Sequence, residues 1–293
     1  MDLVVRVPRH PRVGETVLGT SFSTYLGGKG FNQALACARL GADVEMIGCV
    51  GADDFGTSFV ASLEAEGVGH AAVRRDGQGT GVAVPIVDAR GQNAIVMVPQ
   101  SNMRLTVEDV RGAAEAIRSS QVLLLQLEVP LDACLEAAAL ARSAGATVVW
   151  NLAPCEGAPE GALAAADVVV VNESEAAGVL GGAPSASPEE AIECARRLRS
   201  LGAGAAVVTL GAGGAAWASA ANEGHSPAFP AEPVDTVGAG DAFCGALAVV
   251  LAGGGSLAEG VRAGNAAGSL AVAMHGAGPS MPRRDRLMAL LQG

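Results

Sequence analysis

The stretch DVVVVNESE, residues 167–175, joins four consecutive valines to a run of polar residues. An uninterrupted apolar run of this length is typical of a strand that is covered on both faces, as in a parallel sheet. Segments with charges at helical spacing separate it from similar charge-poor runs. The alternation predicts an open, mostly parallel α/β sheet with helices on both faces. The other strand candidates are 44–50, 121–127, 147–150 and 205–210, and the main helix candidates are 106–119, 131–144 and 187–201.

Two stretches break this alternation. Residues 3–26 and 80–98 contain strand and turn signals but no helical pattern. Within the second, VDARGQNA separates two extended runs and indicates a hairpin. We therefore expect a single domain over residues 1–293, in which about 3–26 and 80–101 form a small β-sheet lid beside the α/β body.

Composition excludes several classes of protein. Half of the 293 residues are hydrophobic and 17% are charged, which is not the composition of a disordered chain. A net charge of −11 argues against nucleic acid or an anionic membrane as the main partner. The six cysteines are scattered without a C-x-x-C pair, which favours reduced thiols. No secretory leader is evident, and the longest apolar run, 242–252, is too short to span a bilayer. We expect a cytoplasmic protein.

Polar residues follow the predicted strands. Glu128 comes after QVLLLQL, Asn151 after TVVW, and NESE after DVVVV, while TLGAGG closes AAVV. Ligands of open α/β sheets bind at the carboxyl ends of the strands, so these residues indicate a site there. The G-x-G-x-x-A within TLGAGGAA matches a variant of the dinucleotide fingerprint, but the residues after it favour another strand over a helix. We therefore do not expect a nicotinamide dinucleotide.

A second decisive stretch is VDTVGAGDAFCGALAVV, residues 234–250. Its apolar part predicts a helix, and VGAG is then the turn at the helix N-terminus. Backbone N–H groups there have no partner within the helix, and glycines let an anion approach them closely. The helix dipole favours the carboxylate form of Asp241. Asp241 could simply cap the helix, but capping accounts neither for the glycines nor for Asp235.

These residues resemble a known family. DTVGAGDAFCGAL (235–247) closely resembles the C-terminal signature of the ribokinase-like, or PfkB, carbohydrate kinases. GGKGFNQALACARLGADVEMIGCVGADDFG (27–56) resembles their N-terminal signature. QLEVP, NLAP, VNESEA and HGAGPS extend the similarity over nearly the whole chain.

The resemblance implies an ATP-dependent sugar kinase. Asp241 would be the base that deprotonates a sugar hydroxyl, and Gly238, Ala239 and Gly240 would form the anion hole. The remaining implied site residues fall into four groups. Asp2, Gly28, Lys29, Gly30, Asn32 and Glu128 would bind the sugar with Asp241; Asn172, Thr209, Leu210, Gly211, Ala212, Gly213, Gly214, Gly240 and Asn265 would contact ATP; Glu175 would serve Mg²⁺; and Asp235, Val237, Ala271, Met274, Gly276 and Ser280 would hold K⁺.

The N-terminus departs from the family pattern. Members begin with a core strand that ends in G-x-x-N-x-D, and Met1 and Asp2 match only the last two places of that pattern. Loss of a central strand would remove ladder hydrogen bonds and open a void in the core. We therefore expect the natural product to begin upstream of Met1.

The resemblance also suggests the acceptor. D-Ribose, phosphorylated at its 5-hydroxyl, is the expected substrate, although PQSN (99–102) departs from the usual PGAN of the lid. Fructose and other ketoses are alternatives. A nucleoside is disfavoured because aromatic residues, which stack on bases, make up only 3% of the chain. A non-catalytic sugar-binding protein would have no need of Asp241 in a glycine turn. By analogy with the family, we expect a homodimer formed through the lid.

Overall fold

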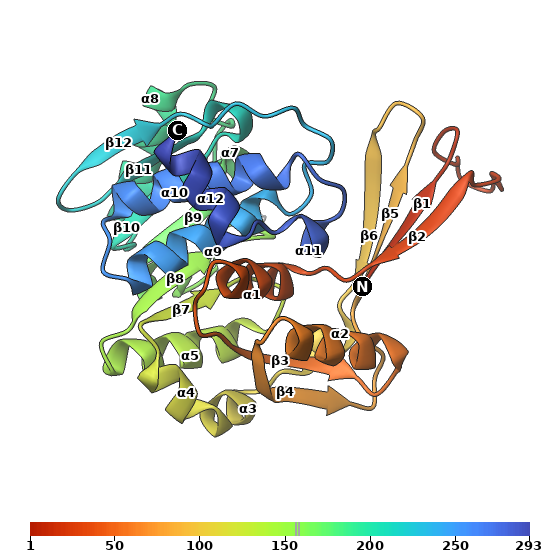
Figure 1. The fold of residues 1–293 in the computed structure, drawn as a ribbon, viewed down its shortest axis with the longest axis horizontal. Coiled ribbons are helices and arrows are strands. Elements are labelled where there is room, and N and C mark those ends of the chain that lie inside the picture. Colours follow the sequence, from red (N-terminus) through yellow and green to blue (C-terminus); the bar gives the residue numbers. More distant parts are fainter. Residues whose placement is uncertain (156, 158) are drawn as a thin grey trace.

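The computed structural model describes residues 1–293 except 156 and 158. It consists of an α/β body from which a small sheet projects (Figure 1). The main sheet has the strand order β12-β11-β10-β9-β8-β7, in which β7 to β10 are parallel and β10 to β12 antiparallel. This confirms the predicted open, mostly parallel sheet. The strands are β7 (Val122–Leu125), β8 (Thr147–Asn151), β9 (Val168–Asn172), β10 (Ala205–Thr209), β11 (Ala215–Ala218) and β12 (Glu223–Ser226).

Alternate valines of β9 enter two separate cores. Val169 and Val171 pack in one hydrophobic cluster, whereas Val168 and Val170 pack in the other. Successive side chains of a strand point to opposite faces, so a strand without polar residues must be covered on both sides. One core is covered chiefly by α5 and α8 and the other by α9 and α10. The body helices are α5 (Leu131–Ser143), α6 (Ala162–Ala165), α7 (Glu173–Leu180), α8 (Pro188–Ser200), α9 (Ala239–Ala252), α10 (Leu257–Ala271), α11 (Ala277–Ser280) and α12 (Arg284–Gln292).

The predicted helix over 106–119 is wrong in one respect. The segment forms two short helices, α3 (Val107–Gly112) and α4 (Ala114–Ser119), on either side of Ala113. Ala113 has φ −97° and ψ 11°, outside helical geometry. Gly112 immediately before it has little intrinsic preference for a helix, which makes the break inexpensive.

The sheet is interrupted between β7 and β3. Strands β3 (Glu45–Gly51) and β4 (Gly69–Asp76) form a separate parallel pair, covered by α1 (Lys29–Arg39) and α2 (Asp54–Ala65). All residues of β7 and residues 45–50 of β3 border one cavity of about 1360 Å³.

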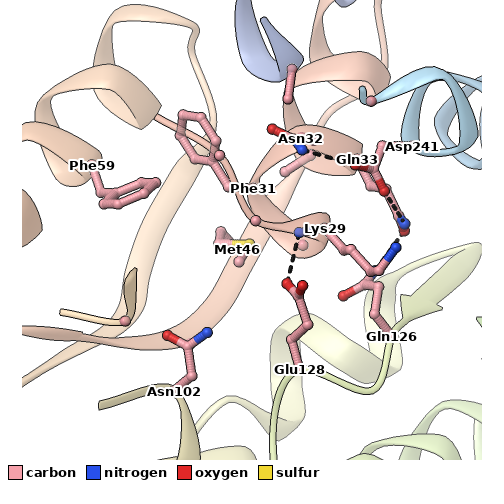
Figure 2. Close-up of a pocket in the computed structure, with 18 of the residues that line it drawn as sticks. Lys29, Phe31, Asn32, Gln33, Met46, Phe59, Asn102, Gln126, Glu128 and Asp241 are labelled. Atoms are coloured by element: carbon pink, nitrogen blue, oxygen red, sulfur yellow. Dashed lines mark hydrogen bonds between the residues drawn. The ribbon is translucent and has the colours of Figure 1, made fainter. Parts of the chain in front are cut away.

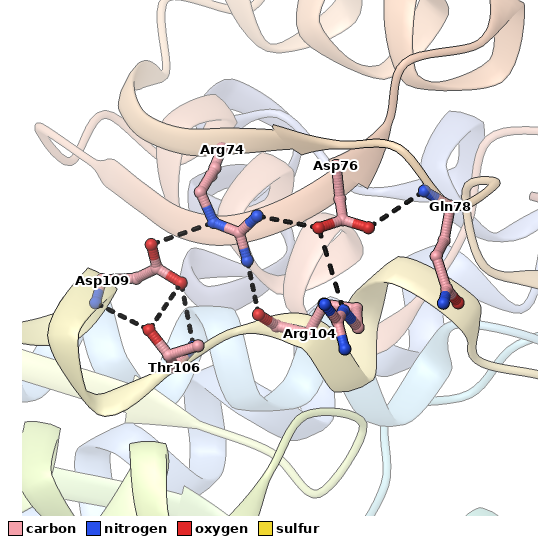
Figure 3. Close-up of polar contacts among 6 residues, drawn as sticks. All are labelled: Arg74, Asp76, Gln78, Arg104, Thr106 and Asp109. Atoms are coloured by element: carbon pink, nitrogen blue, oxygen red, sulfur yellow. Dashed lines mark hydrogen bonds and ion pairs between the residues drawn. The ribbon is translucent and has the colours of Figure 1, made fainter.

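Charged side chains attach the β3–β4 pair to the body (Figure 3). Arg74 of β4 donates hydrogen bonds to Asp76 and to Asp109, each at 2.9 Å. Asp109 also closes a capping box with Thr106 at the start of α3. Arg104, in the 3₁₀ turn η1 (Gln100–Arg104), adds an ion pair of 3.9 Å with Asp76.

The projecting sheet has the order β2-β1-β5-β6. Its strands are β1 (Asp2–Arg6), β2 (Ser21–Tyr25), β5 (Val82–Val87) and β6 (Asn93–Val98). Strands β5 and β6 form the antiparallel hairpin predicted around VDARGQNA. Asp88 shapes the turn, because its Oδ1 accepts hydrogen bonds from the backbone N–H groups of Arg90 and Gln92.

None of the helices in the described part of the chain is long and apolar enough to cross a membrane. The six cysteines are all free thiols. Burial raises the pKa of the Cys37 and Cys134 thiols to about 12, which makes them poor nucleophiles.

Candidate active site

The polar strand ends lie together at one edge of the main sheet. Asn151, Asn172 and Thr209 are the last residues of β8, β9 and β10, and Glu128 follows the end of β7. Parallel pairing places Thr209 beside Asn172 and Asn151 beside Val170. The carboxyl ends of these strands therefore share one edge, where ligands of open α/β sheets bind.

Helix α1 begins at this edge. The backbone N–H of Lys29 donates a 2.8 Å hydrogen bond to Glu128, so the glycine loop before α1 and the segment after β7 hold each other (Figure 2). Asp2 comes close to the same loop from the base of the projecting sheet. A Cβ on Gly27 would lie 2.2 Å from the Oδ2 of Asp2, so only glycine permits this approach.

Asp241 is buried, with 7% of its surface exposed, and both of its carboxylate oxygens accept a hydrogen bond from α1. The side-chain amide of Asn32 donates to Oδ2 at 2.8 Å, and that of Gln33 donates to Oδ1 at 2.9 Å. Figure 2 shows these contacts beside the side chain of Lys29. Asp241 lines the large cavity together with Asp2, Lys29 and Glu128, so it borders the space in which a ligand would lie.

Electrostatics in the site are a balance between burial and pairing. Burial raises the pKa of Asp241, while Lys29 and the amides of Gln33 and Asn32 act to lower it. The dipole of α9 favours the carboxylate form of Asp241, whereas burial disfavours it, and this burial could not be inferred from the sequence. Burial also disfavours the ammonium of Lys29, but the nearby carboxylates Asp241, Glu128 and Glu175 outweigh this and raise the pKa of Lys29. Burial likewise raises the pKa of Glu128 and Glu175.

The N-terminus of α9 presents open backbone donors. Gly238, the N-cap, has φ 82°, and a Cβ there would lie 3.0 Å from the Cα of Ala277. Among the described residues, no acceptor is found for the N–H groups of Gly240 and Asp241. Ala239 makes only a long 3.4 Å contact with the carbonyl of Thr236. A Cβ on Gly240 would meet no atom within 4 Å, so this turn is open to an approaching ligand.

The residues implied for ATP form a second group outside the cavity lining. Asn172 and Glu175 cap α7 reciprocally, each accepting a 2.8 Å hydrogen bond from the other's backbone N–H. Thr209 leads into the η2 turn (Gly211–Gly213), which is closed by a hydrogen bond from the N–H of Leu210 to the carbonyl of Gly214. Residues 211–213 are exposed.

Asn265, a member of this second group, contacts the rest of it indirectly. Its amide donates to the carbonyls of Ser226 and Pro227 at 2.8 and 3.3 Å. A Cβ on Gly214 would lie 2.1 Å from that same carbonyl of Ser226, so the two segments are in close contact. Asn265 thereby braces the loop beside Gly214.

The two loops implied for a monovalent cation adjoin each other. Asp235 accepts hydrogen bonds from the N–H groups of Val237 and Gly276, both at 3.0 Å. The N–H of Asp235 donates to the carbonyl of Val272, between Ala271 and Met274. Ser280 is buried and donates its hydroxyl to the carbonyl of Ala277 within α11.

Sequence reasoning missed three polar residues that border the cavity. Gln33 and Gln126 are joined by a 2.6 Å hydrogen bond, and Asn102 faces the cavity near Met46 (Figure 2). A glutamine beside Asn32 on the buried face of α1, and a second one in the apolar run QVLLLQL, were the available signals. The PQSN departure also has a local consequence, because Gln100 adopts a φ of 43° and its side chain donates to the carbonyl of Thr80.

Comparisons with known proteins agree over nearly the full chain. The family model described as pfkB family carbohydrate kinase matches residues 1–284. A ribokinase of Bacillus subtilis is 37% identical over 291 residues, covering 99% of this chain and 96% of that protein. A deoxyribokinase of Salmonella typhi is 36% identical over 250 residues, covering 85% and 81%. The solved structure of Arabidopsis thaliana ribokinase, complexed with ribose and ATP, superimposes with a TM-score of 0.91 at 32% identity and covers 100% of this chain and 96% of that one.

The fold and the full-length similarities together indicate a carbohydrate kinase. The chain belongs to the PfkB family of carbohydrate kinases. Within that family it is a sugar kinase of the ribokinase type. The alternative of a non-catalytic sugar-binding protein is therefore set aside.

Proposed function

We propose that the protein transfers the γ-phosphoryl group of ATP to the 5-hydroxyl of D-ribose, with Asp241 as general base and residues 238–241 as anion hole. One observation carries this proposal. Asp241 is a buried acid that borders the cavity, in the same helical turn as two backbone N–H groups that have no acceptor among the described residues. A base and an anion hole must adjoin each other for phosphoryl transfer to an alcohol.

The sugar would be held on the side of the cavity formed by α1 and the end of β7. Asp2 and Glu128 supply acceptors for sugar hydroxyls, and the side chains of Lys29 and Asn32 supply donors. The oxygen Oδ1 of Asn32 is buried without a partner among the described residues, so it is available to a hydroxyl. A site that pairs each hydroxyl discriminates strongly against sugars that lack one.

In the transfer step, the hydroxyl oxygen of the sugar bonds to the γ-phosphorus while the bond between that phosphorus and the β,γ-bridging oxygen breaks. The hydroxyl proton passes to the carboxylate of Asp241, and ADP leaves. The N–H groups of Gly240 and Asp241 stabilise the charge on the transferring group. Burial raises the pKa of Asp241, which brings it closer to the working pH of a general base.

ATP would lie along the second group of residues, Asn172, Thr209–Gly214 and Asn265. Mg²⁺ keeps most of its ligands as water and phosphate oxygens and needs few carboxylates. Glu175, whose charge acts on Lys29 and Asp241, would bind its hydration shell. Bound Mg²⁺ neutralises phosphate charge. K⁺ prefers carbonyl oxygens, and the loops joined by Asp235 would provide them.

We further propose a cytoplasmic homodimer that associates through the projecting sheet. Its edge strand β6 exposes four consecutive apolar side chains, Ile95, Val96, Met97 and Val98, each at least 44% exposed. An exposed apolar edge strand tends to pair with another chain.

The test is an assay of ADP release with ribose, deoxyribose, fructose and adenosine as acceptors, with and without Mg²⁺ and K⁺. The proposal requires the highest kcat/KM with ribose and formation of ribose 5-phosphate, identified by NMR. A clear preference for any of the other three acceptors would refute the choice of sugar. Absence of turnover with all four would refute the proposed kinase function.

A further inference from the structure

Gln33 has contacts that sugar or nucleotide binding does not explain. It is 1% exposed and lies next to Asn32 on α1. Its Nε2 donates to Asp241 at 2.9 Å and to the side chain of Asn151 at 3.2 Å, while its Oε1 accepts from Gln126 at 2.6 Å. All polar atoms of this side chain are thus engaged by protein groups.

The direction of these hydrogen bonds is fixed from one end. The side-chain amide of Asn151 donates to the backbone carbonyl of Val170 at 3.1 Å, and a carbonyl only accepts. Asn151 must therefore turn its oxygen towards Gln33, which requires Gln33 to present its N–H groups. If the Gln33 amide were reversed, its oxygen would lie against the Asp241 carboxylate and its N–H groups against the N–H donor of Gln126, so both hydrogen bonds would be lost.

We propose that Gln33 is a positioning residue that holds Asp241 in one orientation and in its ionised form, as the end of a chain of amides anchored on Val170. The inference rests on the proposed role of Asp241 as the base. Gln33 and Asn32 each donate to a different oxygen of Asp241, so the carboxylate cannot rotate without losing a charge-assisted hydrogen bond.

Other charged and titratable groups also act on Asp241. Lys29 on α1 lowers its pKa. Burial is the main cause of the raised pKa of Asp2 on β1, Glu128 after β7, Glu175 on α7 and Cys244 on α9, and the charge of Asp241 raises each of them further. Most of these neighbours are themselves acidic, so their negative charge disfavours the ionised form of Asp241. The two amide donors and Lys29 are the groups that favour it, so removal of one donor has a measurable consequence.

The test is the pH dependence of kcat/KM for ribose in Gln33→Met, which keeps the length of the side chain and removes its amide. Loss of a hydrogen bond to the ionised form raises the pKa of Asp241, so the base is protonated up to a higher pH. A charge-assisted bond of this kind corresponds to an upward shift of the acidic limb by about 1–2 pH units. Turnover should fall below that of wild type on the acidic limb and recover as the pH rises, with the KM for ATP within about threefold of wild type. Gln292→Met, an exposed change at the end of α12, is the matched control and should behave as wild type.

A fall in kcat that is equal at all pH values would mean that Gln33 only fills space, and an unchanged enzyme would mean that it has no role; either result overturns the inference. If Gln33→Met does not fold, Gln126→Met decides, because it frees the Gln33 amide and should shift the limb in the same direction by a smaller amount. An unshifted limb in that variant also overturns it. Failure of the proposed function looks different, because Asp241→Asn would then keep its turnover.

Discussion

Replacement of Asp241 by asparagine is the most direct test of the catalytic arrangement. The carboxamide has nearly the same shape but cannot take the proton of the sugar hydroxyl. Loss of a general base lowers turnover by about 10²–10⁴-fold, which corresponds to about 2.7–5.5 kcal/mol of activation free energy. ATP binding should persist, because the backbone N–H groups of Gly240 and the residue at position 241 are unchanged.

The effect on stability follows from the two hydrogen bonds to α1. Asn32 and Gln33 each donate to one oxygen of Asp241, and asparagine offers a single oxygen. One buried donor then faces an NH₂ group, at a cost of about 1–3 kcal/mol. Removal of a buried charge offsets part of this cost. We therefore expect a folded protein whose unfolding free energy is lower by no more than about 3 kcal/mol.

The assay combines steady-state ADP release with calorimetric titration of ATP and thermal unfolding. Asp285→Asn is the matched control, because Asp285 is an exposed acid in the first turn of another helix, α12. It should leave turnover unchanged. Near-normal turnover of Asp241→Asn, or loss of ATP binding in a folded variant, would refute the reasoning.

Three further predictions follow from the geometry. Gly238→Ala should lower the unfolding free energy by about 2 kcal/mol or more in urea denaturation, because φ is 82° there and the new Cβ would press on Ala277; an unchanged midpoint would contradict this. Val96→Lys on exposed β6 should convert a dimer to a monomer in light scattering, and a monomeric wild type or a dimeric variant would refute the proposed interface. A ten-residue extension fused to Met1 and containing five β-branched apolar residues should pair between β3 and β7 and raise the melting temperature. The same extension with a central proline should not raise it, because proline cannot donate a ladder hydrogen bond. Equal melting temperatures of the two variants would exclude strand pairing.

Much of the fold could be predicted because the sheet is built from residues with no other plausible role. The four valines of β9 are buried on both faces, so their uninterrupted run carries a strong signal. No comparably strong signal in the sequence indicated the break at Ala113. The conformation of this single residue depends on how α3 and α4 pack on α5. By contrast, the strand expected after TLGAGG is confirmed, because the segment is too short for a long helix and forms two antiparallel strands, β11 and β12.

The position of Asp241 could be predicted, because an acid beside glycines indicates the N-terminus of a helix, and Asp241 lies in the first turn of α9. The amide network was not predictable, because Gln33 is 93 residues from Gln126 and 208 from Asp241. Amides carry no charge, and their role depends on the direction of each hydrogen bond in the folded chain. The balance that sets the pKa of Asp241 was hidden for the same reason, because burial is a property of the assembled site.

The arrangement of charge also explains how a protein of net charge −11 can act on ATP. The carboxylates of Asp2 and Glu128 line the cavity, where a neutral sugar needs acceptors for its hydroxyls. The transferred phosphoryl instead needs donors, and in the proposed mechanism the backbone N–H groups of α9 would provide them without a side chain. Asp241 lines the cavity and lies in the first turn of α9, so in the proposed mechanism the proton would leave the sugar there as the phosphoryl group arrives. With acceptors on one side of Asp241 and donors on the other, a negatively charged protein would bind an anionic substrate through local dipoles rather than through its net charge.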